Sequence, residues 1–326
     1  MSELARLGDI VDRMPLAGHV GKSGAGLERV RTADGSSYVV KRISADSDIL
    51  HALLGGGPGR EYLLWREGTL DRLPTGVTHA VVDAWCEDDV TVIVMRDLGD
   101  RVLTWDDRLT AERTRWVLQR VAALHGAFLG DPPRAVAPLV PVLDQFAPHR
   151  LGALTGFDNP LPALAARGWE IFADLVAADV AEPVLAILAD VGPYAAALLE
   201  AGPSTLVHGD LATVNMAFEG DDLVLLDWAM PVVAPGALDV ARLLAGCSSV
   251  IGLDREEAIA AYRDAAGSAY DETAMRLSLM LGLVWLGWNK ALDAAEHPDP
   301  AIRARERDDL DWWVLQARTT LETGVL

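Results

Sequence analysis

The chain changes its secondary-structure pattern once, near residue 98, and this change limits the folds open to it. Before that point, short β-rich runs are separated by turn sequences and predict two hairpins with a helix between them. The predicted strands span residues 28–32, 37–43, 80–85 and 90–95, and the predicted helix spans residues 60–73. We therefore expect a small β-rich lobe in the order strand, strand, helix, strand, strand.

Beyond Leu98 the pattern is mainly helical. Apolar residues repeat along one helix face from residue 117 to residue 128. Further helices are predicted over residues 169–180 and 195–201, with Pro183 and Pro193 as breaks.

One short β island interrupts the helical part, at residues 205–207 and 223–227, and helices resume at Ala237. We therefore expect an α+β protein with two domains. These are a β-rich lobe over residues 1–98 and a larger, mainly helical lobe over residues 99–326.

The charge balance excludes several classes of partner. The chain has 28 Lys+Arg against 48 Asp+Glu, for a net charge of −20. Nucleic acids and anionic membranes are bound through basic side chains, so neither is expected as a partner. The longest apolar run, residues 277–288, is about half the ~20 residues that cross a bilayer. The N-terminus lacks the basic and apolar segments of a secretion signal, so a cytoplasmic protein is expected.

The β island carries the pattern with the clearest chemistry. His208-Gly209-Asp210 is followed by Asn215, and an apolar run then leads to Asp227. Phosphoryl transfer from a nucleotide needs a carboxylate for the attacking hydroxyl, and an amide and a second carboxylate for Mg²⁺. Asp and Asn also occur in turns, where they cap backbone groups. The combination favours the catalytic interpretation.

These residues resemble the aminoglycoside phosphotransferase and choline kinase group, which are small-molecule kinases with a bilobal, protein-kinase-like fold. The resemblance implies that Asp210 is the catalytic base and that Asn215 and Asp227 are the Mg²⁺ ligands. It also implies that His208 shapes the loop and that Asp239 has a structural role.

The same resemblance calls for a lysine on the third strand that contacts the α- and β-phosphates, and Lys41 stands there. Only three of the 28 basic residues are lysines, so a lysine at this place is informative. A glutamate on the following helix is expected to pair with it. Glu61 fits better than Glu67, because Glu61 precedes the apolar face of that helix; a solvated glutamate is the alternative.

Two further nucleotide contacts follow from position in the resembling fold. Met95, Asp97 and Leu98 lie where the backbone between the lobes binds adenine. The glycine-rich segment 18–26 lies where a loop covers the phosphates, which makes Ser23 and Gly24 candidates. This segment does not match the pattern GxGxxG.

We therefore expect an O-phosphotransferase that uses Mg²⁺ and ATP, or GTP, and acts on a hydroxyl of a small molecule. The expected acceptor is an aminoglycoside-like or other amino-sugar or nucleoside antibiotic. Acidic residues between 293 and 311 could receive a cationic acceptor, or could form a solvated helix face instead. A metabolic sugar, amino-sugar or amino-alcohol kinase is the alternative, and a pseudokinase or interaction module is a third possibility. The protein is expected to be a monomer or a homodimer.

Overall fold

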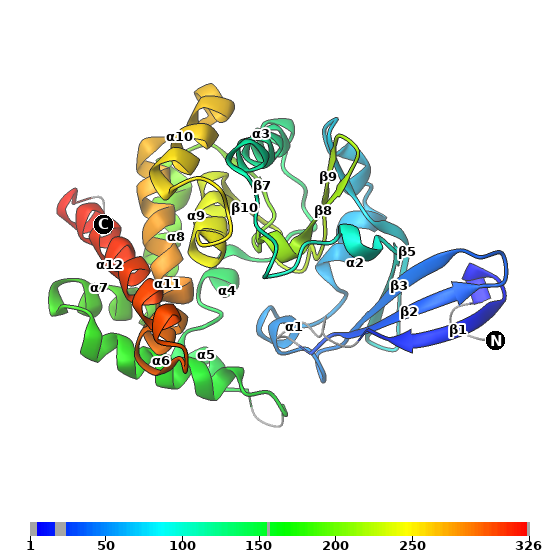
Figure 1. The fold of residues 1–326 in the computed structure, drawn as a ribbon, viewed down its shortest axis with the longest axis horizontal. Coiled ribbons are helices and arrows are strands. Elements are labelled where there is room, and N and C mark those ends of the chain that lie inside the picture. Colours follow the sequence, from blue (N-terminus) through cyan, green and yellow to red (C-terminus); the bar gives the residue numbers. More distant parts are fainter. Residues whose placement is uncertain (1–4, 17–23, 155–156, 325–326) are drawn as a thin grey trace.

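The computed structural model describes residues 5–16, 24–154 and 157–324. Figure 1 shows a twisted sheet from the N-terminal part of the chain at one end and a mainly helical region at the other. The structure therefore confirms the predicted α+β class, with a β-rich N-terminal lobe and a larger helical lobe.

Five antiparallel strands form the N-terminal sheet, in the order β1-β2-β3-β6-β5. They are β1 (Ile10–Pro15), β2 (Gly26–Thr32), β3 (Ser37–Ile43), β5 (Val81–Glu87) and β6 (Val90–Arg96). Both predicted hairpins, β2–β3 and β5–β6, are confirmed. Strand β1 was not predicted, because its side chains are nearly all exposed at the sheet edge and do not alternate in polarity.

Two short helices follow β3, namely α1 (Ile49–Leu53) and α2 (Arg60–Arg66). The prediction of one helix over residues 60–73 is wrong at its C-terminal end. Gly68 adopts a φ of +70°, which ends the helix, and Leu70–Arg72 forms only a 3₁₀ turn. Helix α1 has only five residues and was not predicted.

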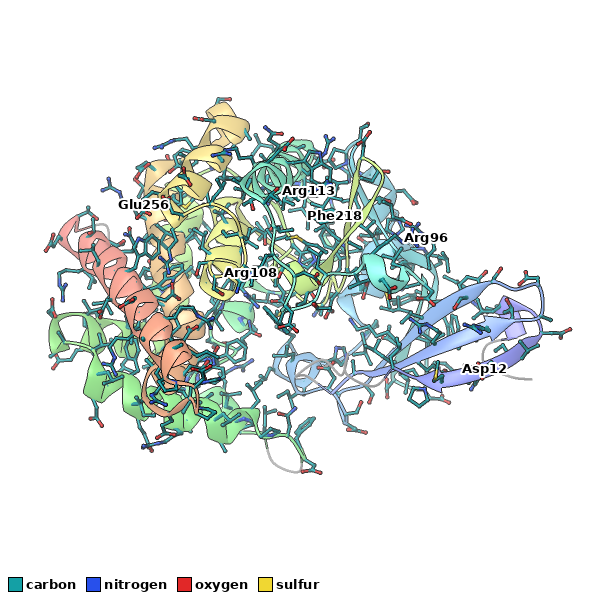
Figure 2. All side chains as sticks on the ribbon, viewed as in Figure 1. Asp12, Arg96, Arg108, Arg113, Phe218 and Glu256 are labelled. Atoms are coloured by element: carbon teal, nitrogen blue, oxygen red, sulfur yellow. The ribbon has the colours of Figure 1, made fainter. Side chains whose placement is uncertain are left out.

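One strand from the N-terminal part of the chain belongs to a second sheet. Strand β4 (Val77–His79) pairs in parallel with β9 (Asp222–Leu225), which pairs with β8 (Met216–Glu219). Arg96, at the end of β6 (Figure 2), donates to the carbonyl of His79 at 2.9 Å and to the carboxylate of Glu219 at 2.5 Å. This sheet therefore ties the two lobes together.

The predicted β island is present, with differences. Strand β7 (Ser204–Val207) pairs with β10 (Val232–Pro235), and β9 ends two residues before Asp227. Strands β8 and β10 were not predicted, because four residues are too few for a clear alternation.

Ten helices of the described chain build the larger lobe around α11. They are α3 (Ala111–Ala127), α4 (Leu139–Leu143), α5 (Pro148–Leu151), α6 (Leu161–Leu175), α7 (Ala178–Ala189), α8 (Gly192–Ala201), α9 (Ala237–Cys247), α10 (Arg255–Ala266), α11 (Glu272–Glu296) and α12 (Pro300–Glu322). Helix α11 packs against α6, α9 and α12. Trp285 and Trp313 are fully buried in this core.

The predicted break at Pro183 is wrong, because α7 continues through this proline. The predicted helix over residues 169–180 breaks instead between Leu175 and Ala178. Contacts of α7 with α6, α11 and α12 offset the hydrogen bond that a proline removes. Pro193 does mark a boundary, since it lies in the first turn of α8.

No single helix among the described residues is long and apolar enough to cross a membrane. Helices α7 and α8 reach that length and composition only together, and they are bent by 99° at their junction.

Candidate active site

The loop between β7 and β8 carries His208, Gly209 and Asp210, and its backbone is held by one buried carboxylate. Asp239, at the start of α9, accepts the N–H of His208 at 2.8 Å and that of Gly209 at 2.9 Å. Gly209 has a φ of +81°, and a Cβ atom there would lie 1.8 Å from the carbonyl oxygen of Met230. The loop therefore requires glycine before Asp210.

The charge of Asp239 is also stabilised from the side of α3. Complete burial would raise the pKa of Asp239, but the hydrogen bond from His125 at 3.1 Å and the loop N–H groups outweigh burial and hold its pKa below the ordinary value. His125 is bonded in turn to the hydroxyl of Tyr262 at 2.8 Å. Asp239 thus stays ionised as an acceptor for the loop.

His208 shapes the same loop from within. Its Nε2 atom is 2.9 Å from the carbonyl oxygen of Leu226, and its ring packs against Trp228 with centroids 4.6 Å apart. Its Nδ1 atom accepts the N–H of Asp210 at 3.3 Å. His208 is fully buried, so it links the loop to the segment that carries Asp227.

Both carboxylate oxygens of Asp210 have a partner. The amide nitrogen of Asn215 donates to Oδ2 at 3.1 Å and to the carbonyl oxygen of Asp210 at 2.9 Å. Nη2 of Arg242, on α9, lies 2.5 Å from Oδ1. The carboxylate is held in one orientation, while 22% of its side-chain surface remains exposed.

Lys41 and Glu61 meet Asp227 on the other side of the site. The ammonium of Lys41 lies 2.6 Å from Oδ1 of Asp227 and 3.4 Å from Oε2 of Glu61. Glu61 is buried, whereas Glu67 caps the end of α2 and is exposed. The structure thus brings Glu61, and not Glu67, to Lys41.

These three groups set one another's charge. Burial alone would lower the pKa of Lys41, but the carboxylates of Asp227 and Glu61 raise it above the ordinary value. Enclosure in the cleft opposes ionisation of Asp227, yet Lys41 holds the pKa of Asp227 below its ordinary value. Burial raises the pKa of Glu61, and Lys41 only partly offsets this.

The backbone at Asp227 has the left-handed conformation, with a φ of +60°. Asp and Asn tolerate this region better than other side chains, and strained residues of this kind occur often at functional sites. The side chain of Asp227 keeps 42% of its surface exposed. Lys41, Glu61, Asp210 and Asp227 all line one small cavity of about 40 Å³.

The remaining predicted nucleotide contacts lie away from the described lining of this cavity. Met95 is in β6 and Leu98 is buried just after it. The carboxylate of Asp97 accepts from Ser37 at 2.7 Å and pairs with Arg29 at 2.7 Å, so it fastens the end of β6 to β2 and β3.

The glycine-rich loop can be followed only in part. Gly24 has a φ of +104°, and a Cβ atom there would lie 2.1 Å from the carbonyl oxygen of Ser47, so this position requires glycine. Ser23 lies outside the described residues.

A comparison with protein families decides the relationship. A model of the phosphotransferase enzyme family matches residues 92–277, which is more than half of the chain. The chain belongs to this family. The expected resemblance to small-molecule kinases is thereby confirmed, and the protein is a phosphotransferase.

Solved structures agree with this membership at the level of the fold. An aminoglycoside phosphotransferase from Alicyclobacillus acidocaldarius is 17% identical, with 97% of this chain and 92% of that chain covered and a TM-score of 0.52. The choline kinase LicA from Streptococcus pneumoniae is 12% identical, with 96% of each chain covered and a TM-score of 0.53. The amicoumacin kinase hAmiN is 13% identical, with 94% of this chain and 88% of that chain covered and a TM-score of 0.55. No curated protein matches the chain.

Among the described residues of the candidate site, Arg242 was not predicted from the sequence. It stands three positions after Asp239, which places both on neighbouring turns of one face of α9. A basic residue at that spacing from a buried acid is the only signal that could have indicated it. Its Nη1 atom is buried without a hydrogen-bond partner among the described residues.

Proposed function

We propose that this phosphotransferase moves the γ-phosphate of ATP, or of GTP, to a hydroxyl group of a small molecule with the help of Mg²⁺. The observation that carries the proposal is the convergence of Lys41, Asp210 and Asp227 on one cavity between the lobes. The lobe boundary is proposed at residue 98, so that residues 1–98 bind the nucleotide and residues 99–326 carry Asp210 and the acceptor site.

The roles of the nucleotide-side residues follow from their charges. Lys41 remains an ammonium ion, because two carboxylates raise its pKa, and it is therefore suited to bind the α- and β-phosphates. Glu61 orients Lys41 from the buried side. The backbone at Met95, Asp97 and Leu98 is proposed to bind the base, and Ser23 and Gly24 to cover the phosphates.

Asp210 is proposed to act on the acceptor. Its carboxylate is held by Asn215 and Arg242, so it can accept a hydrogen bond from the attacking hydroxyl in a defined direction. The acceptor oxygen forms a bond to the γ-phosphorus as the bond to the β-phosphate oxygen breaks. The hydroxyl proton goes to Asp210, and the nucleoside diphosphate leaves with the electron pair of the broken bond.

The donor atoms present suit Mg²⁺. The amide nitrogen of Asn215 is hydrogen-bonded to Asp210, which leaves the amide oxygen of Asn215 for a metal ion. Lys41 contacts Oδ1 of Asp227, which leaves Oδ2 of Asp227 as the second oxygen for the metal ion. Carboxylate and amide oxygens, completed by phosphate oxygens and water, match the preference of Mg²⁺. No cluster of three or more His, Cys, Asp or Glu arranged for a metal occurs among the described residues. When bound, the ion would neutralise charge on the phosphates.

For the acceptor we propose an amino-sugar or nucleoside compound, including aminoglycoside-like antibiotics. Relatives by fold are named as kinases of aminoglycosides, choline and amicoumacin, which supports a hydroxylated amine. A metabolic sugar or amino-alcohol kinase would use the same residues.

The test is nucleotide consumption with Mg²⁺ and ATP or GTP across aminoglycosides, nucleosides, amino sugars and amino alcohols. Asp227→Asn is the blank, because asparagine tolerates the left-handed backbone that this position requires. Acceptor-dependent turnover that the blank loses supports the proposal. Binding of nucleotide without turnover on any acceptor would favour a pseudokinase, and absence of both contradicts the proposed site.

A further inference from the structure

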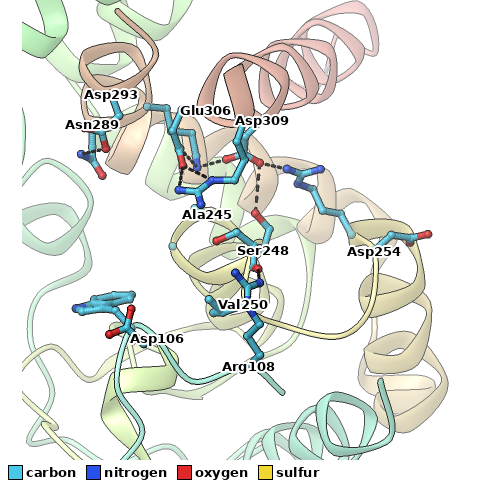
Figure 3. Close-up of a pocket in the computed structure, with 16 residues that line it drawn as sticks. Asp106, Arg108, Ala245, Ser248, Val250, Asp254, Asn289, Asp293, Glu306 and Asp309 are labelled. Carbon is cyan, nitrogen blue, oxygen red and sulfur yellow. Dashed lines mark hydrogen bonds and ion pairs between the residues drawn. The ribbon is translucent and has the colours of Figure 1, made fainter. Parts of the chain in front are cut away.

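A second cavity lies in the helical lobe, and the proposed chemistry does not yet use it. It has a volume of about 570 Å³ and lies between the ends of α9 and α11, the helix α12 and the segment from Trp105 to Arg108 (Figure 3). Binding sites for small molecules commonly have volumes of this order. The cavity is therefore large enough for the acceptor, whereas the cavity at Lys41 is not.

Two of its walls are connected to the loop that carries Asp210. Gly246 lines the cavity one turn after Arg242 on α9, and a methyl group at Gly246 would lie 2.6 Å from Nη1 of Arg242. Arg242 in turn contacts Asp210. Because Nη1 of Arg242 faces Gly246 and its Nη2 lies 2.5 Å from Oδ1 of Asp210, a single guanidinium group separates the cavity wall from the Asp210 carboxylate.

The wall formed by Trp105 and Asp106 is connected to the same loop. The N–H of Leu103 donates to the carbonyl of Met216 at 2.9 Å, directly after Asn215. Trp105 and Asp106 follow two and three residues later and line the cavity. A molecule held between these walls would therefore lie beside the segment that carries Asp210 and Asn215.

The charges around the cavity are nearly balanced, in contrast to the chain as a whole. Five acidic and four basic side chains line it, so the sum is −1 in a chain with a net charge of −20. Asp309 is buried and pairs with Lys290 and Arg255, and Glu306 pairs with Arg305 at 2.8 Å. The two acids of α12 that line the cavity are thus neutralised by protein groups.

The lining groups on the other side of the cavity are of a different kind. Trp105 lines the cavity with 53% of its surface exposed. The carboxylate of Asp106 is exposed, and Asn289, which also lines the cavity, donates to Asp293 at 3.1 Å. Figure 3 shows Asp106 and the Asn289–Asp293 pair on one side of the cavity and the Glu306–Asp309 network on another. An indole ring stacks on the apolar face of a sugar or on a cation, and carboxylates and amides bind hydroxyl and ammonium groups.

We propose that this cavity holds the acceptor and that the acceptor is a single hydroxylated ring with one amine, an amino sugar or aminocyclitol, stacked on Trp105. This inference rests on the proposed phosphotransfer to a small-molecule hydroxyl. The amine lies toward Asp106 and Asp293. The hydroxyl groups face α9 and the loop of Asp210.

The charge balance disfavours an acceptor with four or five ammonium groups. Such a molecule needs several carboxylates that are not already paired, because each enclosed ammonium loses hydration that only a counter-charge replaces. Arg108, which donates to the carbonyl oxygen of Ser249 at 2.7 Å rather than to a carboxylate, would repel it instead.

The experiment compares acceptors and variants by coupled measurement of nucleoside diphosphate release. Glucosamine carries one amine, N-acetylglucosamine carries none that ionises, and kanamycin carries several. We expect kcat/KM for glucosamine to exceed that for the other two by about tenfold or more. Trp105→Ala and Asp106→Asn should each raise KM for glucosamine about tenfold and change kcat by less than about threefold. Trp105→Phe should restore most of the affinity.

Asp311→Asn is the matched control, because Asp311 is an exposed acid of α12 outside the cavity lining, and it should leave KM unchanged. Preference for kanamycin, or cavity variants with unchanged KM, would overturn the proposal. If no acceptor is phosphorylated, calorimetry of glucosamine binding separates the two claims. Binding that Trp105→Ala weakens would retain the cavity site and reject the proposed function, whereas no binding would reject the cavity site.

Discussion

Two lysines occupy the described part of the chain, and both are buried between two carboxylates. Lys41 lies between Glu61 and Asp227, and Lys290 lies between Glu306 and Asp309. Their exposed fractions are nearly equal, at 6% and 4%. The difference is in the partners. Asp227 exposes 42% of its side chain, whereas Asp309 exposes 6% and is also paired with Arg255.

Because of this difference, Lys41 can exchange its carboxylate partner for a ligand and Lys290 cannot. If Lys41 binds phosphate as proposed, the phosphate can replace Asp227 as the partner of its ammonium group, because solvent already reaches that carboxylate. Lys290 and Asp309 are enclosed by α10, α11 and α12, so their pairing holds the cavity wall together. Of these two lysines, only Lys41 therefore has a partner that a ligand could replace.

The largest effect is expected at the accessible partner. Asp227→Asn removes a proposed metal ligand and the counter-charge of Lys41, and turnover should fall by about 10³ or more. The folded state should persist, because the side chain is partly exposed and asparagine suits the backbone. Steady-state turnover and circular dichroism measure the two quantities. Retained turnover would remove Asp227 from the proposed site.

The enclosed pair should respond in the opposite way. Asp309→Ala leaves Lys290 and Arg255 buried without a counter-charge, and the free energy of unfolding should fall by about 3 kcal/mol. Urea denaturation measures this loss. The double variant Lys290→Met/Asp309→Leu removes both charges and should recover most of it. If Asp309→Ala were as stable as the wild type, the network would not hold the wall.

Asp210→Asn should lower kcat by about 10², the usual scale for a positioned acid–base group. Its nucleotide affinity should stay within about threefold, since Asp210 does not contact Lys41. Single-turnover kinetics together with nucleotide titration distinguish the two effects. An unchanged kcat would show that the acceptor hydroxyl needs no help from this carboxylate.

Arg242→Met tests the contact between α9 and Asp210. We expect kcat to fall about tenfold, because the carboxylate of Asp210 loses one of the two side chains that hold its orientation. Arg242→Lys should recover part of kcat, because an ammonium group can still donate to Oδ1 of Asp210. A loss of thermal stability with an unchanged kcat would assign Arg242 a purely structural role.

The smallest expected effect is the contribution of the Lys41–Asp227 ion pair to the stability of the fold in acid. Because Lys41 holds the pKa of Asp227 below its ordinary value of 3.8, the pair stabilises the fold above that pH and loses its contribution as pH falls further. Solvent screening keeps this contribution below about 1 kcal/mol. Urea midpoints of wild type and Asp227→Asn should therefore differ by a constant amount from pH 8 to pH 5 and converge below about pH 4.

The sequence indicates those features that depend on local pattern. The hairpins β2–β3 and β5–β6 follow from alternation and turn residues, and Lys41 and the Asp210 loop follow from motif and resemblance. Features that depend on distant contacts were not predictable. The edge strand β1 has no buried face, and Pro183 is tolerated because neighbouring helices hold α7.

The candidate site shows the same division. The acids between residues 293 and 311 were predicted either to receive a cationic acceptor or to form a solvated helix face, whereas Arg255 and Lys290 neutralise one of them, Asp309, in the interior. Arg242 is ordinary in sequence, and only the fold of α9 against the loop brings it to Asp210. Pairing between side chains far apart in the chain leaves no periodic signal.

The parallel pairing of β4 with β9 has a consequence for how the chain folds. Val77 and Leu223 are partners although 146 positions separate them, whereas the strands of both hairpins are joined by short turns. Closing so long a loop is slow compared with forming a hairpin. During synthesis the N-terminal sheet can form early, but β4 must wait until more than two thirds of the chain has been made. The segment leading to Asp227 is therefore expected to be ordered late, so that nucleotide binding reports the last steps of folding.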